Sequence, residues 1–177
     1  KFKESYRLDR KPIEVNFRRI ADQIGGPNRA SHLIHSYPAK LIQHIPFFFI
    51  NNTVYSSPGD TVLDPFCGSG TVLLEALLAG RNAIGADCNP LARLISKVKT
   101  TPLSVDLIEQ YSERIKTELA SAPCEPKPSV VNINYWFSAN TSDELARIAF
   151  AIRSIPENDY REFYEICLSS ILKKVSF

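Results

Sequence analysis

Apolar residues occur along this chain in two patterns, as short continuous runs and as longer stretches with helical spacing. Two short runs, at residues 62–63 and 83–86, are each followed by an acid, Asp64 and Asp87. Between them, residues 71–79 carry apolar side chains at helical spacing, which predicts a helix that Gly80 ends. The order of strand, glycine turn, helix, strand and acid predicts the first half of a doubly wound nucleotide-binding unit.

Helical spacing predicts further helices on both sides of this unit. Upstream, Pro38 is placed to open a helix that runs toward Phe49, because its fixed φ suits a first turn. Downstream, the predicted helices cover a segment that Pro90 opens and residues 100–102 end, residues 105–120, a segment capped by Thr141 or Ser142, and about residues 160–173. Clustered prolines predict a loop at residues 121–130.

These patterns divide the chain into three predicted parts: a basic arm at residues 1–30, an α/β core at residues 31–104 and a helical extension at residues 105–177. The arm holds eight Lys and Arg residues against four Asp and Glu residues. This excess of positive charge predicts either a solvated surface arm or a contact with the phosphate backbone of DNA.

The composition is that of an ordinary soluble domain, with 44% hydrophobic residues, 23% charged residues and a net charge of +2. The sequence shows neither a signal peptide nor a long apolar span, so we expect a cytoplasmic protein with no membrane partner. Four widely spaced cysteines and three scattered histidines predict reduced thiols and no metal site. The lack of any methionine indicates either a fragment or a sequence whose methionines were replaced or left out.

The turn between the first strand and its helix carries the residues of a cofactor site. Gly68 and Gly70 have no Cβ, so a ligand can lie close to the backbone and to the N–H groups that start the helix. Asp87, 23 residues after Asp64, is placed to accept both hydroxyls of a ribose. A carboxylate at Asp64 would repel a pyrophosphate and attract an ammonium. The charge at this position therefore disfavours NAD and favours S-adenosylmethionine (SAM), whose amino-acid end carries an ammonium.

Three segments together resemble the DNA amino-methyltransferases, which modify adenine N6 or cytosine N4. Residues 64–71, Asp-Pro-Phe-Cys-Gly-Ser-Gly-Thr, resemble the SAM-binding motif I of that family, and residues 82–92 resemble its motif II. Residues 35–40, His-Ser-Tyr-Pro-Ala-Lys, resemble its motif X. The three segments stand in the order X, I, II, which makes the resemblance far more specific than a Gly-x-Gly pair alone.

The resemblance implies a Rossmann-like SAM-dependent methyltransferase fold, α/β, with a partial, doubly wound and mostly parallel sheet and a helical extension. It implies SAM as the cofactor, DNA as the partner and an exocyclic amino group as the methyl acceptor. Motif X is expected to cover the methionine end of SAM. The residues expected to bind SAM are Tyr37, Pro38, Lys40, Asp64, Pro65, Phe66, Gly68, Ser69, Gly70, Thr71, Asp87, Cys88 and Asn89.

Polar residues close to these motifs are expected to have simpler roles. Glu75 is predicted to be a surface acid of its helix, His32 a surface or helix-face residue, and Lys99 a solvated residue. Cys88 is predicted either to contact the adenine of SAM or to pack as a core thiol. His35 is predicted to be either a capped or surface histidine or a ligand contact.

One motif that amino-methyltransferases need is absent from these residues: an Asp, Asn or Ser followed by two prolines and an aromatic residue. That loop holds the amino group of a flipped base while the amine attacks the methyl group. The motif order predicts that the loop follows Phe177, in a missing C-terminal part or in a second subunit, so the catalytic residues are unknown. Three alternatives stay open: an RNA guanine-N2 methyltransferase, a split enzyme completed by a partner chain, and a non-catalytic subunit that keeps the fold.

Overall fold

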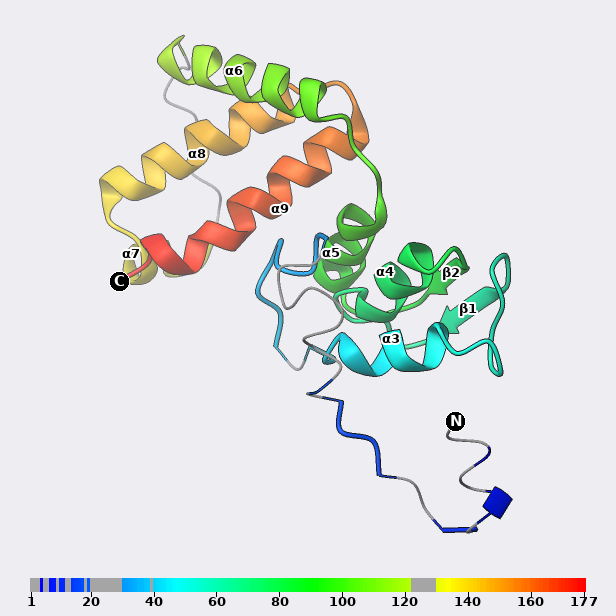
Figure 1. Cartoon of the computed structure of the whole chain (residues 1–177). Coiled ribbons are helices and arrows are strands. Elements are labelled where there is room, and N and C mark those ends of the chain that lie inside the picture. Colours follow the sequence, from blue (N-terminus) through cyan, green and yellow to red (C-terminus); the bar gives the residue numbers. More distant parts are fainter. Residues whose placement is uncertain are drawn as a thin grey trace.

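The computed structural model describes residues 4, 7–8, 10–11, 14–17, 19, 30–38, 40–121 and 130–177, so most of the predicted basic arm and of the predicted loop at residues 121–130 lies outside it. An α/β unit is followed by a group of helices (Figure 1). The α/β unit contains α3 (His44–Ile50), β1 (Thr61–Asp64), α4 (Thr71–Leu78), β2 (Asn82–Gly85) and α5 (Pro90–Thr100). The helices after it are α6 (Val105–Ser121), α7 (Ile133–Trp136), α8 (Ala139–Arg153) and α9 (Asn158–Val175). No helix in the described ranges is long and apolar enough to cross a membrane.

The two strands pair in parallel, with Thr61 opposite Asn82 and Asp64 opposite Gly85. Helix α4 connects them and packs against both. Because the carboxyl ends of parallel strands lie at one edge, the acid that ends β1 and the acid that follows β2 come to the same side of the sheet. The predicted strand–helix–strand unit is confirmed as an α/β arrangement with a small parallel sheet.

Helix α9 packs on α5 and joins the helical group to the α/β unit. Ile95 and Val98 of α5 and Ile166 of α9 form a buried apolar cluster. The loop before α3 is held by the same helix, since His35 Nε2 lies 3.1 Å from Ser169 Oγ of α9. His35 is therefore a partly buried link between the motif X segment and α9. The helical extension supports the segment that carries motif X.

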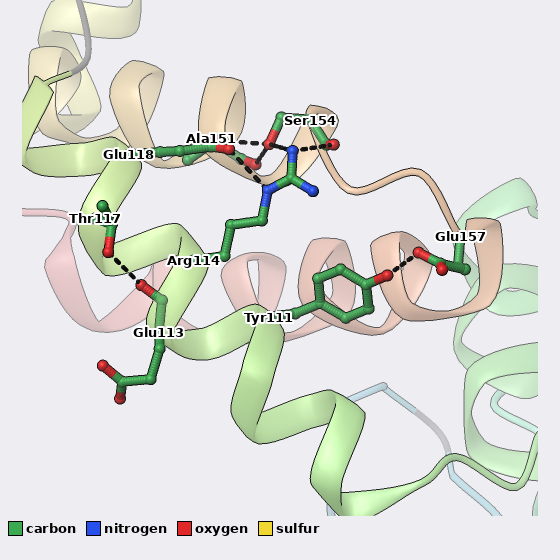
Figure 2. Close-up of polar contacts among 8 residues, drawn as sticks. All are labelled: Tyr111, Glu113, Arg114, Thr117, Glu118, Ala151, Ser154 and Glu157. Carbon is green, nitrogen blue, oxygen red and sulfur yellow. Dashed lines mark hydrogen bonds and ion pairs between the residues drawn. The ribbon is translucent and has the colours of Figure 1, made fainter.

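Polar contacts fix α6 against the end of α8 and the start of α9 (Figure 2). The guanidinium of Arg114 donates to the carbonyl of Ser154 at 3.1 Å and to the carboxylate of Glu118 at 2.9 Å. The Ser154 hydroxyl donates to that same carboxylate, and Tyr111 donates its phenolic hydrogen to Glu157. These contacts make α6, α8 and α9 one packed group, which lies beside the α/β unit in Figure 1.

The helix predicted to begin at Pro38 begins instead at His44, so that prediction is wrong at its start. The reason is Pro46, whose ring would clash with the carbonyl of Ile42 in a helix that already ran through residue 42. A proline is tolerated in a first turn, where its missing N–H has no partner to lose. Beginning the helix at His44 places Pro46 in that turn.

The start of α8 also differs from the prediction. Ser138 caps the helix, since its hydroxyl oxygen accepts the backbone N–H of Thr141 at 3.1 Å. The predicted caps, Thr141 and Ser142, lie inside the helix, and Ser142 is buried. Helix α7, a single turn before α8, was not predicted at all.

Candidate cofactor site

A cavity of about 280 Å³ lies beside the glycine turn, where β1 ends and α4 begins. Both the motif X segment and motif I contribute to its wall. Seven of the residues predicted to bind SAM line it: Tyr37, Lys40, Asp64, Phe66, Gly68, Ser69 and Thr71. Leu41, Cys67 and Val72 complete the lining. The fold thus brings two separate predicted segments to one cavity.

The two acids at the strand ends accept hydrogen bonds from the backbone around them. Asp64 Oδ1 accepts from the N–H of Phe66 at 3.1 Å. Asp87 accepts from the N–H of Asn89 at 2.8 Å and from the N–H of Gly68 at 2.9 Å, one bond to each oxygen. These two backbone hydrogen bonds lower the pKa of the Asp87 carboxyl. A carboxylate oxygen has two lone pairs, so Asp87 can still accept from the hydroxyls of a ligand.

Only glycine suits the last position of the turn. Gly70 has a φ of +72°, in the left-handed region that side chains disfavour. A Cβ there would lie 2.4 Å from the Ser96 hydroxyl oxygen and 3.0 Å from the Ser96 Cα. The Gly70 N–H closes the turn by donating to the Cys67 carbonyl at 2.7 Å. Cys67 is buried, and burial raises the pKa of its thiol.

The start of α4 places a buried polar side chain beside the cavity. Thr71 is 3% exposed, and its hydroxyl has no hydrogen-bond partner in the described part of the chain. No side chain caps this helix at Gly70. A buried hydroxyl without a partner costs roughly 1–3 kcal/mol, and the first N–H groups of a helix attract anions. These features suit the carboxylate of an amino-acid ligand, so the residues present fit the methionine end of SAM.

The motif X segment is tied to the rest of the site by two side chains. Asn89 donates through its side-chain amide to the Tyr37 hydroxyl oxygen at 3.2 Å, which links motif X to motif II. Lys40 donates to the carbonyl of His32, and burial lowers the pKa of the Lys40 ammonium. Lys40 therefore lines the cavity as a cation that is already held in place.

Six of the predicted site residues do not line the cavity: Pro38, Pro65, Gly70, Asp87, Cys88 and Asn89. Three of these are connected to it, since Gly70 lies in the turn and the other two, Asp87 and Asn89, bond to lining residues. Pro38, Pro65 and Cys88 are exposed. The exposure of the Cys88 thiol shows that the core-thiol alternative for this residue is wrong.

Three polar residues close to the site are buried, contrary to the predictions. Glu75 and His32 are 0% and 1% exposed, and His32 Nε2 lies 2.8 Å from Glu75 Oε1. Lys99 is 4% exposed and donates to the carbonyl of Ser69 in the turn. The burial of Glu75 could have been predicted from the sequence, because its helix is apolar on nearly all sides. A helix of that kind is buried, and an acid within it then needs a partner. In the described residues, no group of three or more His, Cys, Asp and Glu is placed to hold a metal ion.

Comparison of the sequence with known protein families finds a match over the residues that form this site. Residues 18–97 match the family described as DNA methylase, whose members are N6 and N4 methyltransferases. Over these residues the chain is similar to the N6/N4 DNA methylases. The matched residues include both strands, the glycine turn and the whole lining of the cavity. The resemblance predicted from motifs X, I and II is confirmed.

Three proteins similar to this chain are named Type II methyltransferases. M.MvaI of Kocuria varians is 33% identical over 156 residues, which are 82% of this chain and 34% of that protein. M.MthZI of Methanothermobacter thermautotrophicus is 32% identical over 118 residues, or 63% of this chain and 32% of that protein. M.MjaII of Methanocaldococcus jannaschii is 32% identical over 91 residues, which are 50% of this chain and 17% of that protein. The chain thus spans about a third or less of these relatives, and no solved structure matches it.

Proposed function

We propose that this chain is the SAM-binding part of a site-specific DNA methyltransferase that methylates adenine N6 or cytosine N4. The observation that carries the proposal is the cavity beside the glycine turn, which Asp64 and Lys40 line together with Thr71, whose buried hydroxyl has no hydrogen-bond partner among the described residues. An acid, a cation and an anion-binding helix start suit a ligand that carries both an ammonium and a carboxylate. The DNA methylase family and the names of the relatives support DNA as the substrate.

Each group has a proposed role toward SAM. Asp64 attracts the α-ammonium, while Thr71 and the start of α4 bind the α-carboxylate. Asp87 accepts the ribose hydroxyls, as the acid after the second strand does in Rossmann-like folds, and we assign that fold to the chain. Tyr37 and Phe66 flank the ligand, and the predicted contacts of Pro38, Pro65, Cys88 and Asn89 lie at its edges.

In this proposal the described residues bind and orient SAM, whose sulfonium supplies an activated methyl group. Positioning of this kind accounts for much of the rate in a direct transfer between two bound partners. The group that holds the flipped base belongs to a loop with two prolines and an aromatic residue, which residues 1–177 lack. We propose that sequence outside these residues, in the same protein or in a second subunit, supplies it.

Titration calorimetry of the chain with SAM, and with NAD as the competing cofactor class, tests the binding proposal. We expect SAM to bind and NAD not to bind, because Asp64 would repel a pyrophosphate. Asp64→Asn should weaken SAM binding, whereas the matched change Asp106→Asn, at an exposed acid of α6, should leave it unchanged. Binding of NAD in preference to SAM, or equal effects of the two variants, would contradict the assignment.

The transfer step is tested on the complete protein encoded by the source gene, with labelled SAM and duplex DNA. Mass spectrometry of the digested DNA should detect N6-methyladenine or N4-methylcytosine and so identify the base. Methylated guanine in RNA, with unmodified DNA, would favour the RNA methyltransferase alternative. SAM binding without any transfer would favour a non-catalytic or split subunit, and a partner chain that restores transfer would decide for the split enzyme.

A further inference from the structure

Lys99 is a buried lysine directly beneath the glycine turn. It is 4% exposed, its ammonium donates to the carbonyl of Ser69, and it lies 3.5 Å from the Ser69 hydroxyl oxygen. Lys99 stands three residues after Ser96 on α5, so both side chains lie on one face of that helix. Ser96 is the residue that abuts Gly70. One face of α5 therefore forms the floor of the turn.

The peptide unit between Ser69 and Gly70 is held at both ends. Its carbonyl oxygen accepts from Lys99, and its N–H donates to the Cys67 carbonyl at 2.7 Å. Since a peptide unit is planar and trans, fixing both of these atoms fixes the orientation of the whole unit. The residue after this peptide unit is Thr71, which begins α4 and lines the cavity.

An apolar side chain of similar length would fill the same space as Lys99 without the cost of burying a charge. Burial, together with the nearby charge of Lys40, lowers the pKa of the Lys99 ammonium to about 8. The Lys99 ammonium is thus buried although burial costs desolvation free energy, and its hydrogen bond goes to the backbone of the turn. This combination indicates a role in the shape of the turn that an apolar residue cannot supply.

We propose that Lys99 is a positioning residue of the SAM site, which orients the Ser69–Gly70 peptide and with it the start of α4. The inference rests on the proposed function, since it concerns the same site. Without the ammonium, the Ser69 carbonyl loses its donor and the turn can rotate away from the binding conformation. Replacing Lys99 with methionine should weaken SAM binding roughly tenfold, the size expected when one charge-assisted hydrogen bond is lost.

Other ionisable groups lie on the elements that pack against α5: Lys40 and His32 before α3, Cys67 in the turn, Glu75 on α4, and Asp159, Glu162 and Cys167 on α9. Most of these groups already have a charged or hydrogen-bonding partner other than Lys99. His32 pairs with Glu75, and Asp159 and Glu162 pair with Lys97. Among these groups, Lys40 is the one whose charge acts on Lys99.

The test compares the dissociation constants of the native chain and of its Lys99→Met variant for SAM, by calorimetry between pH 7 and pH 9.5. Dividing the dissociation constant of the variant by that of the native chain at each pH cancels the effect of the titration of SAM itself. This ratio should be about ten at pH 7 and fall toward one as the pH rises above 8, where the native ammonium loses its proton. Lys97→Met, at a half-exposed lysine of the same helix, is the control and should give a ratio near one at every pH.

A second measurement needs no cofactor. In the ¹⁵N-labelled chain, the amide signals of Gly68, Ser69 and Gly70 should shift in Lys99→Met and stay in place in Lys97→Met. A ratio near one at pH 7 with native SAM binding, or unmoved turn signals, would overturn the role of Lys99 and leave the proposed function intact. If the native chain binds no SAM, the proposed function itself fails. A fall in melting temperature with unchanged SAM affinity would make Lys99 a structural residue only.

Discussion

The backbone N–H of Gly68 donates a hydrogen bond of 2.9 Å to the carboxylate of Asp87. This bond joins the turn after β1 to the residue that follows β2, so the two strand ends act as one unit. The other oxygen of Asp87 accepts from the N–H of Asn89, which leads into α5. The acid proposed to hold the ribose therefore also holds the glycine turn in register with the start of the next helix.

Asp87→Ala should weaken SAM binding roughly tenfold or more, because both a ribose acceptor and a turn contact are lost. Calorimetry at pH 7 measures the effect, with Asp106→Ala as the control at an exposed acid. The two backbone hydrogen bonds lower the pKa of Asp87, so its charge, and this contribution to affinity, should persist when the pH falls from 7 to 5. Unchanged affinity in Asp87→Ala would refute the ribose assignment.

The features predicted well from the sequence are local ones. The turn at residues 67–70, the helix after it and the acids at the strand ends lie within one continuous stretch, where spacing and residue type suffice. The buried polar pairs depend on residues far apart in sequence. His32 and Glu75 are 43 positions apart, and Ser69 and Lys99 are 30 apart, so no local pattern could show that each would find its partner. Polarity alone therefore placed Glu75, His32 and Lys99 at the surface or in solvent, and these predictions are wrong because all three side chains are buried.

Gly70→Ala should destabilise the chain more than Gly59→Ala, although both glycines have positive φ. A Cβ at Gly59 meets nothing within 4 Å, so only backbone strain of about 1 kcal/mol is expected. A Cβ at Gly70 meets Ser96 at 2.4 Å, and such overpacking adds roughly 1–3 kcal/mol. Urea unfolding of both variants measures the difference. Equal losses would mean that Ser96 moves aside freely.

Glu75→Ala should lower the free energy of unfolding by about 3 kcal/mol, because removing one member of a buried pair leaves the other without compensation. Its partner His32 belongs to the segment before α3, so motif X should also loosen from the core. Glu109→Ala, at an exposed acid of α6, is the control and should change stability by less than about 0.5 kcal/mol. Comparable unfolding curves for the two variants would show that the His32 contact contributes little.

The contact between α6 and α8 should make stability depend on pH through Glu118 (Figure 2). Hydrogen bonds from the Ser154 hydroxyl and from Arg114 lower the pKa of this carboxyl. A carboxyl with a lowered pKa in the folded state stabilises the fold above its ordinary value of 4.5, and this contribution is lost as the pH falls through the lowered value.

Glu118→Gln should therefore destabilise the chain at pH 7, by less than about 1 kcal/mol because the pair is largely solvated. The difference from the native chain should shrink as the pH falls below 4.5, since the native carboxyl then becomes neutral as well. Urea unfolding of both chains at several pH values measures it. Glu113→Gln, just over one turn earlier on α6, is the matched control: within the described residues its carboxylate pairs with Lys116 of the same helix, so it should show little change at any pH. A Glu118→Gln effect of constant size down to low pH would mean that shape, and not charge, holds α6 against α8.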